Sequence, residues 1–321
     1  MSLFLVTGGA GFIGSNIVGE LLNRGERVRV LDNLCTGKRD NLAFVERLQR
    51  PAADFEFMEG DIRHLDTCRR ACHGVDYVLH QAALCSVPRS INDPSASNDV
   101  NVCGTLTVLM AAREVGVKRV VHASSSSVYG NSEVLPKTES QAPSPVSPYA
   151  VSKLAGEYYC QVFTKVFGLE TVILRYFNVF GPRQDPSSQY AAVIPRFIQL
   201  ALDGKPLQIH GDGLQSRDFT YISNVVDANL QAAEATDAIG HVINIACGQT
   251  SSVLQLADAI ASTLGRKLEY HHTPARTGDV RHSLADISKA QRLLGYETHV
   301  GVFDGLRNTV TYFQNVRARH G

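Results

Sequence analysis

A tyrosine and a lysine stand four residues apart, at Tyr149 and Lys153, and a run of serines at residues 124–127 precedes them. A phenol with a pKa of about 10 is a poor base at neutral pH, and a neighbouring cation lowers that pKa by favouring the phenolate. On a helix, positions i and i+4 share a face, so Lys153 can act on Tyr149 in this way. A serine hydroxyl from another element can share the transferred proton. The pattern predicts an acid–base site, although a bland surface pair would have the same spacing.

The N-terminus predicts a binding site for a dinucleotide. An apolar run of strand length leads into Gly8, Gly11 and Gly14, and a helix with one apolar stripe follows. Glycines permit the tight turn and let backbone amides approach a pyrophosphate at the helix N-terminus. A second strand ends at Asp32, at the distance of roughly 20 residues where a carboxylate binds the adenosine ribose and disfavours a 2′-phosphate. NAD is therefore the expected cofactor.

The composition argues against several classes of function. Lys plus Arg total 31, as do Asp plus Glu, and we find no basic run, so neither nucleic acid nor an acidic membrane surface is an expected partner. No apolar stretch approaches the roughly 20 residues that span a bilayer, and the first strand leaves no room for a signal peptide. The seven cysteines form no Cys-x-x-Cys pair, so we expect no metal site, and reduced thiols in a cytoplasmic protein.

Strands and helices alternate through the first half of the chain, as in a parallel sheet covered by helices. We expect an α/β fold with a Rossmann-type doubly wound sheet over residues 1–175 and a smaller mixed α/β region for substrate over residues 176–321, parts of which pack back on the first. The expected elements of the first half span residues 2–7, 12–24, 27–31, 55–58, 64–72, 76–79, 97–115, 118–123, 148–167 and 170–174. Those of the second are helices near 192–203, 223–235, 252–264, 286–294 and 301–317, and strands near 207–209 and 242–245.

With these motifs the chain resembles the extended short-chain dehydrogenase/reductase family, and within it the UDP-sugar 4-epimerases. The resemblance extends over essentially the whole length. The residues that carry it are 7–14, 32–33, 60–62, 80–83, 101–105, 124–127, 149–153 and 175–178. It implies bound NAD, a UDP-sugar substrate and reversible inversion at C4 of the sugar.

The resemblance implies where each part of the cofactor lies. Asp61 and Ile62 would line the adenine pocket, and Tyr176 would lie beside the nicotinamide. The implied cofactor-binding residues are Gly8, Gly11, Phe12, Ile13, Gly14, Asp32, Asn33, Gly37, Asp61, Ile62, Gln81, Ala82, Ala83, Asn101, Ser124, Tyr149, Lys153 and Tyr176.

The resemblance assigns catalysis to Ser125, Tyr149 and Lys153, because the catalytic serine stands four residues before the tyrosine of a Val-Tyr-Gly element, here Tyr129. Tyr149, as phenolate, would take the proton of the sugar 4-hydroxyl through or alongside Ser125 while C4 passes hydride to NAD. The 4-keto sugar would rotate and take the hydride back on its other face. Lys153 would lower the pKa of Tyr149 and hold the nicotinamide ribose. Relatives that dehydrate or decarboxylate the sugar carry an acid in the serine run, so epimerisation is favoured here.

The second half of the chain carries the resemblance to nucleotide-sugar binding. Arg217 and Arg276 resemble groups that grip a diphosphate, which guanidinium groups suit well. Asp279 would bind the uridine ribose. Ser283 stands where epimerases of plain hexoses carry tyrosine, and the space predicts UDP-N-acetylglucosamine and UDP-N-acetylgalactosamine as substrates. The implied substrate-binding residues are Ser86, Ser125, Ser126, Ser127, Tyr149, Asn178, Gln184, Ala192, Val193, Arg217, Arg276, Asp279 and Ser283.

Alternatives remain open at this point. UDP-glucose and UDP-glucuronate are alternative substrates, since Cys85 stands where the N-acetylhexosamine group usually has glycine. A non-catalytic NAD(H)-binding sensor is an alternative of a different class, although such proteins usually lack the tyrosine or the lysine. Helices near 97–115 and 148–167 resemble the pair that forms a four-helix dimer interface, so we expect a homodimer.

Overall fold

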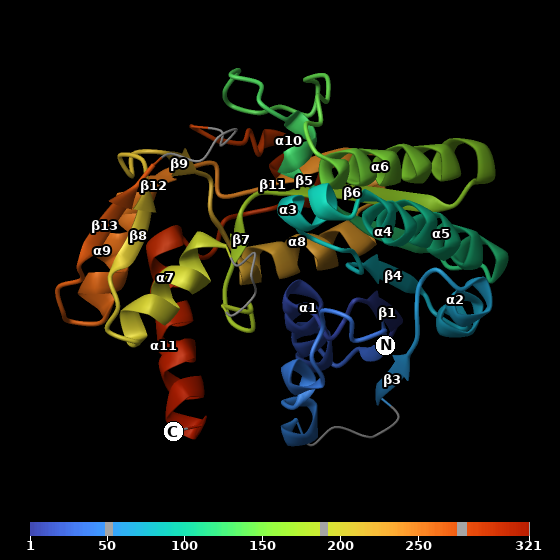
Figure 1. The fold of residues 1–321 in the computed structure, drawn as a ribbon. Helices are drawn as coiled ribbons and strands as arrows, with labels where there is room; N and C mark the ends of the chain where they lie inside the picture. The colour runs from blue at the N-terminus through green and yellow to red at the C-terminus, as the bar shows by residue number, and fades with distance from the viewer. Residues whose placement is uncertain (49–53, 187–191, 275–280, 321) are drawn as a thin grey trace.

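The computed structural model describes residues 1–48, 54–186, 192–274 and 281–320. Its centre is a seven-stranded sheet in the order β11-β6-β5-β4-β1-β2-β3, in which all neighbouring strands are parallel (Figure 1). The strands are β1 (Leu3–Thr7), β2 (Arg27–Asp32), β3 (Phe55–Glu59), β4 (Tyr77–His80), β5 (Arg119–Ser125), β6 (Glu170–Tyr176) and β11 (Val242–Ile245). The predicted Rossmann-type fold is confirmed. Because the strand order reverses between β1 and β4, a ligand crevice is expected at their carboxyl ends.

Helices cover both faces of this sheet. On one face lie α1 (Phe12–Asn23) and α8 (Ile222–Glu234), and on the other lie α2 (Leu65–Cys72), α5 (Gly104–Glu114) and α6 (Pro148–Phe167). Successive side chains of a strand point to opposite faces. Val6 accordingly packs in the apolar cluster that contains α1, and Leu5 packs in the cluster that contains α2 and α5. Strands buried on both faces explain the near-continuous apolar runs of the sequence.

The predicted helix over 97–115 is divided in the structure. Two short helices, α3 (Val87–Asn92) and α4 (Pro94–Asn98), precede a π-helical turn η4 (Asp99–Cys103) and then α5. Ser86 and Asp93 cap the two short helices by accepting hydrogen bonds from Arg89 N and Ala96 N. Proline in the first turn suits each of these starts. Sequence analysis missed α3 because six residues are too few to show a helical period.

A second layer of helices and short strands packs beside the sheet, on the left in Figure 1. It contains α7 (Val193–Leu202), α9 (Val253–Thr263), α11 (Val302–His320) and the parallel pair β8 (Leu207–His210) and β13 (Tyr270–Thr273), with α10 (Ser288–Leu294) close to β11. Two-residue strand pairs join β7 (Val179–Phe180) to β10 (Thr220–Tyr221) and β9 (Ser216–Arg217) to β12 (Ser251–Ser252). Such short strands have no periodicity from which to predict them.

The two halves of the sequence share the central sheet. β11 follows residue 175 by more than sixty positions and still pairs with β6, and α8 packs on β4, β5 and β6. Short 3-10 turns complete the described chain at η1 (Arg39–Leu42), η2 (Val45–Arg47), η5 (Ser126–Tyr129) and η6 (Thr236–Ala238). Within the described ranges, none of the helices combines the length and the apolar character that a membrane crossing requires.

Candidate active site

The glycine turn after β1 is shaped by close backbone contacts. Gly8 has φ of +68°, and a Cβ there would lie 2.8 Å from the backbone of Ala82. A Cβ on Gly14 would lie 2.2 Å from the carbonyl oxygen of Gly8. Since only glycine fits both positions, the turn brings its backbone amides and the start of α1 directly against the space above the sheet.

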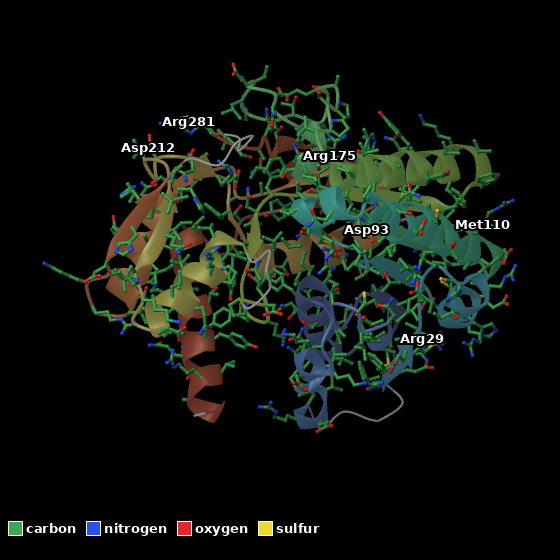
Figure 2. The ribbon with its side chains drawn as sticks, viewed as in Figure 1. Arg29, Asp93, Met110, Arg175, Asp212 and Arg281 are labelled. Atoms are coloured by element: carbon green, nitrogen blue, oxygen red, sulfur yellow. The ribbon has the colours of Figure 1, made fainter. Side chains whose placement is uncertain are left out.

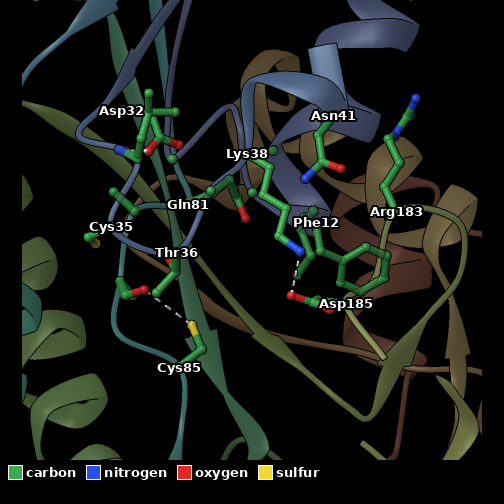
Figure 3. Close-up of a pocket in the computed structure, with 18 of the residues that line it drawn as sticks. Phe12, Asp32, Cys35, Thr36, Lys38, Asn41, Gln81, Cys85, Arg183 and Asp185 are labelled. Carbon is green, nitrogen blue, oxygen red and sulfur yellow. Dashed lines mark hydrogen bonds and ion pairs between the residues drawn. The ribbon is translucent and has the colours of Figure 1, made fainter. Parts of the chain in front are cut away.

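A cavity of about 910 Å³ opens at this turn and runs along the carboxyl ends of β1, β2 and β4 (Figure 3). This is the crevice expected from the strand order, and its volume suits a dinucleotide. The predicted residues that line it are Gly8, Gly11, Phe12, Ile13, Gly14, Asp32, Asn33, Gly37, Asp61, Ile62, Gln81, Ala82, Ala83, Ser86 and Gln184. The structure therefore brings most of the predicted cofactor residues together, along with two of the predicted substrate residues.

Asp32 lies at the end of β2 with its carboxylate fixed by the backbone. Its Oδ2 accepts a hydrogen bond from Ala10 N at 2.9 Å, and its Oδ1 accepts one from Leu34 N at 2.8 Å. Burial raises the pKa of Asp32, while these two hydrogen bonds lower it. A Cβ on Gly37 would lie 2.9 Å from this carboxylate, so glycine keeps the loop close to it.

Two cations near Asp32 could in principle bind a 2′-phosphate, but both are engaged. Lys38 Nζ pairs with Asp185 at 2.8 Å across the cavity, as Figure 3 shows. Arg39 pairs with Glu59 at 2.8 Å and lies over the ring of Phe57. The surroundings of Asp32 therefore favour NAD over its 2′-phosphorylated form.

Helix α6 carries the tyrosine and the lysine, and its start is fixed by capping. Ser147 Oγ accepts a hydrogen bond from Ala150 N, and Pro148 occupies the first turn. The side chain of Tyr149 lies close to Ser125, at the end of β5, and to the Cys85 thiol, which lines the cavity. The structure thus brings Tyr149 and Ser125 together next to the cavity wall.

Lys153 is buried one helical turn after Tyr149, and its Nζ donates a hydrogen bond of 2.8 Å to the carbonyl oxygen of Ala123. Burial lowers the pKa of Lys153. Burial raises the pKa of Tyr149 well above its ordinary value, Cys85 raises it further, and only the interaction with Ser125 lowers it. In the chain by itself desolvation of the phenol thus outweighs the other effects, and the role predicted for Lys153 toward Tyr149 stays a prediction for the NAD-bound protein.

A buried polar network supports the cavity floor. His80 Nδ1 lies 2.7 Å from Thr7 Oγ1, and His80 Nε2 lies 3.0 Å from Thr105 Oγ1. Burial lowers the pKa of His80 to about 3, so this imidazole is neutral. Asn101 accepts a hydrogen bond from Leu84 N and donates one to Ser152 Oγ. Asn101 thus holds the loop after β4 against α6, behind the cavity wall.

Two other predicted cofactor residues also lie behind the wall. Tyr176 Oη is within 3.2 Å of Gln81 and within 3.0 Å of Asn229, so the ring is anchored beneath the cavity. Ser124 Oγ donates a hydrogen bond to Glu157 at 2.5 Å. Tyr176 thereby holds Gln81, which does line the cavity, whereas Ser124 is bonded to the buried Glu157.

The predicted sugar-side residues are dispersed. Ser127 Oγ is buried without a partner among the described residues, which leaves a hydroxyl free for a ligand, and its backbone N donates to Ser125 Oγ, with Ser126 between them. Asn178 Nδ2 donates to Asp218 O, Arg217 NH1 donates to Ser216 O, and Ser283 N donates to Ser216 O. Ala192 and Val193 form the start of α7. Arg276, Asp279 and the stretch 190–191 lie outside the described residues. The substrate roles of all these residues stay predictions.

Sequence reasoning missed a part of the cavity wall that comes from distant segments. Tyr312, Phe313 and Val316 of α11 line the cavity, and so does Arg183 of the loop after β7. Arg183 donates to Asn16 Oδ1 at 2.7 Å and lies over the ring of Phe44, which ties this loop to α1. No local pattern marks these side chains, since long-range packing alone brings them to the cavity. The missed wall also includes Cys35, Thr36, Asn41, Gly60, Leu84, Arg89, Val100 and Pro186.

Among the residues that the structure describes, no group of three or more His, Cys, Asp or Glu side chains is arranged to hold a metal ion. The predicted acid–base groups Tyr149, Ser125 and Lys153 lie beside a cavity whose glycine turn fits a pyrophosphate and whose Asp32 fits a ribose.

Comparison with known proteins gives matches over nearly the whole chain. Residues 4–246 match the model of the NAD dependent epimerase/dehydratase family. A UDP-glucose 4-epimerase of Mycolicibacterium smegmatis is 39% identical over 313 residues, which cover 97% of this chain and 98% of that protein.

Solved structures match equally well. A UDP-N-acetylglucosamine 4-epimerase from Methanobrevibacter ruminantium, in complex with UDP-N-acetylmuramic acid, superposes with a TM-score of 0.92 at 39% identity and covers 98% of this chain and 99% of its own. A UDP-glucuronic acid 4-epimerase from Bacillus cereus, with UDP-glucuronic acid and NAD, gives a TM-score of 0.89 at 35% identity with the same coverage.

Proposed function

This chain belongs to the NAD-dependent epimerase/dehydratase family, with the UDP-sugar 4-epimerases among its relatives, and we propose that it acts preferentially on UDP-N-acetylglucosamine and UDP-N-acetylgalactosamine. The observation that carries the activity is the proximity of Tyr149 and Ser125 beside the dinucleotide cavity, with Lys153 buried one turn further along α6. These are the groups that a proton transfer from a sugar hydroxyl requires.

NAD, when bound, supplies a hydride acceptor and a positive charge close to the phenol. Because burial holds the pKa of Tyr149 high, the chain needs such a charge, together with Lys153, to favour the phenolate. Tyr149 then takes the proton of the sugar 4-hydroxyl as C4 loses its hydride, which leaves a 4-keto sugar. After the sugar has turned over, C4 would take the hydride back on its other face while Tyr149 returns the proton, so the reaction inverts C4 and consumes no cofactor. Ser125 orients the hydroxyl by sharing its proton with Tyr149.

The proposed preference for N-acetylated sugars is supported by Ser283. Its backbone is fixed to β9 through Ser216 O at 3.1 Å, so its short side chain keeps a defined place in the segment that precedes α10. A serine there leaves room that a tyrosine would fill. UDP-glucose and UDP-glucuronate are the alternative substrates, since relatives with those names match at similar identity.

The test is to purify the protein without adding NAD and to offer UDP-N-acetylglucosamine, UDP-glucose and UDP-glucuronate separately, with the products followed by NMR. We expect interconversion of the 4-epimers without added cofactor, with the largest kcat/KM for the N-acetylated sugar. Bound NAD without turnover of any of the three would instead identify a non-catalytic sensor.

We also propose that the protein is a homodimer formed through α5 and α6. Apolar side chains are exposed along α6 at Tyr158, Val162 and Val166, which share one face. Met110, labelled in Figure 2, is exposed on α5, which packs against α6. A second copy of the same two helices would bury this apolar surface in a four-helix interface. Light scattering of the purified protein tests this, and a monomeric mass at micromolar concentration would contradict it.

A further inference from the structure

A buried charged pair lies directly behind the catalytic groups. Glu157 is on α6, one turn after Lys153 and two turns after Tyr149, so the three side chains share a face of the helix. Arg175, labelled in Figure 2, comes from β6 and donates to both carboxylate oxygens of Glu157, at 2.8 and 2.7 Å. Glu157 is 2% exposed and Arg175 is 3% exposed. Glu157 also accepts the hydrogen bond from Ser124, the neighbour of Ser125.

The pair continues into a longer polar chain. The guanidinium of Arg175 lies 4.7 Å from the ring centre of Tyr129, and Tyr129 Oη donates to Asn244 Oδ1 at 2.7 Å. Asn244, on β11, donates through Nδ2 to Lys137 O, and Lys137 N donates to Leu284 O. This series of contacts connects helix α6 to the segment that carries Ser283. Its steps from Glu157 to Asn244 are all between side chains.

Stability alone explains this arrangement poorly. Removing two charges from water is costly, and replacing a buried ion pair with apolar residues of similar volume is often neutral or stabilising. β5 and β6 carry a second pair at their opposite ends, where Arg119 donates to Glu170 and to the carbonyl oxygens of Ala232 and Ala235. Glu170 there is 34% exposed, so that pair keeps part of its hydration. The fully buried pair is the one beside Lys153.

The surroundings of Lys153 act on its pKa in opposite directions. The titratable side chains that face Lys153 or Tyr149 are His80 of β4, His122 of β5, Cys85 of the following loop, and Cys160 and Glu157 of α6. Burial lowers the pKa of both histidines, so they are neutral, and burial raises the pKa of the Cys160 thiol. Burial is the largest influence on the pKa of Lys153 and lowers it, whereas Cys85, Cys160 and, after them, Glu157 raise it.

We propose that Glu157 and Arg175 are positioning residues, which hold α6 against β5 and β6 so that Ser125 meets Tyr149. The proposal rests on the proposed function in so far as Tyr149 is the base. It assigns to Ser124, Glu157 and Arg175 the geometry, and to none of them any contact with the sugar.

The test is the substitution Glu157→Gln in the NAD-loaded enzyme, which keeps an acceptor for Ser124 and removes the charge. Weaker anchoring of α6 should move Ser125 away from Tyr149, and Ser125 is the neighbour that lowers the pKa of this phenol. We therefore expect the pKa of Tyr149, read by ultraviolet difference titration with the Tyr149→Phe variant subtracted, to rise by about one unit. At neutral pH kcat should fall about tenfold, with KM changed by less than about twofold. Glu170→Gln is the matched control, and it should leave the titration unchanged.

The double variant Glu157→Gln/Arg175→Met separates positioning from stability, because it removes the unpaired buried charge. We expect it to recover the Tm lost by Glu157→Gln while the titration stays shifted. A normal titration and normal kcat in the double variant overturn the proposal, and so does an equal shift in Glu170→Gln. If the wild-type enzyme converts none of the UDP-sugars, the proposed function fails, whereas the titration of Tyr149 still decides the role of the pair.

Discussion

The dinucleotide end and the sugar end of the molecule are built in different ways. The dinucleotide end is a cavity lined by a glycine turn and by the ends of adjacent parallel strands, in which backbone groups already have their final positions. At the sugar end, Asn178, Arg217 and Ser283 come from three separate segments and are hydrogen-bonded to neighbouring backbone rather than gathered around that cavity. A site made by contiguous residues is set by local geometry, whereas a site made by distant segments depends on how they pack.

The largest expected effect lies where the two ends meet. Replacing Tyr149 with Phe removes the acid–base group, so kcat should fall by about 10²–10⁴-fold on every accepted UDP-sugar. NAD content after purification should equal that of the wild type, because the phenol contributes chemistry rather than the cavity wall. Steady-state kinetics and nucleotide analysis check both points, and near-normal turnover would refute the role of Tyr149.

The scaffold of the sugar end should respond to pH. Asp218 is fully buried and accepts hydrogen bonds from Cys247 N, Gly248 N and Ala285 N, and burial raises its pKa from 3.8 to about 6. The folded state then holds the proton of Asp218 more tightly than the unfolded state. Above pH 6 the ionised Asp218 therefore lowers the free energy of unfolding by about 3 kcal/mol, and this stability is recovered as pH falls towards 4.

The measurement is urea unfolding of the wild type and of Asp218→Asn between pH 7 and pH 4. The variant lacks the titrating group, so the stability of the wild type relative to the variant should increase as pH falls through this range. A constant difference would show that the pKa of Asp218 is not raised in the folded protein.

The dinucleotide end should respond to the smallest added volume. In Gly14→Ala the new methyl group would overlap the carbonyl oxygen of Gly8, so the turn must shift. We expect this shift to cost about 1–3 kcal/mol of binding free energy, which lowers the affinity for NAD by roughly ten- to a hundredfold. Gly301→Ala is the matched control, since its Cβ has no heavy atom within 4 Å among the neighbours tested. Calorimetric titration with NAD compares the two, and equal affinity in both would contradict the close fit.

A substitution at the sugar end should give the smallest effect, and this effect should be selective for one substrate. Ser283→Tyr should lower kcat/KM for UDP-N-acetylglucosamine by about tenfold while changing that for UDP-glucose by less than about threefold. Parallel assays on both substrates measure the ratio. An equal loss on both would mean that Ser283 does not select the substituent at C2.

The same difference, between sites made by contiguous residues and sites made by distant segments, decides how much of the structure the sequence predicts. The order of strand, glycine turn, helix and acid predicted β1, α1, β2 and the place of Asp32, because each step is a local constraint. The raised pKa of Tyr149 was not predictable from spacing, since desolvation depends on every element packed around the ring. The contribution of α11 to the cavity was equally hidden, because Phe313 lies about 300 residues from the glycine turn.

The place of α11 in the cavity wall has a consequence for how the holoenzyme arises. Tyr312, Phe313 and Val316 follow every other described element of the chain and still face the same space as Gly8 and Gly11. While a ribosome still shields this last helix, the Rossmann core can already have formed, but its nucleotide pocket lacks one side. The complete pocket therefore exists only after translation has passed α11, so tight retention of the cofactor has to wait until this helix has been made.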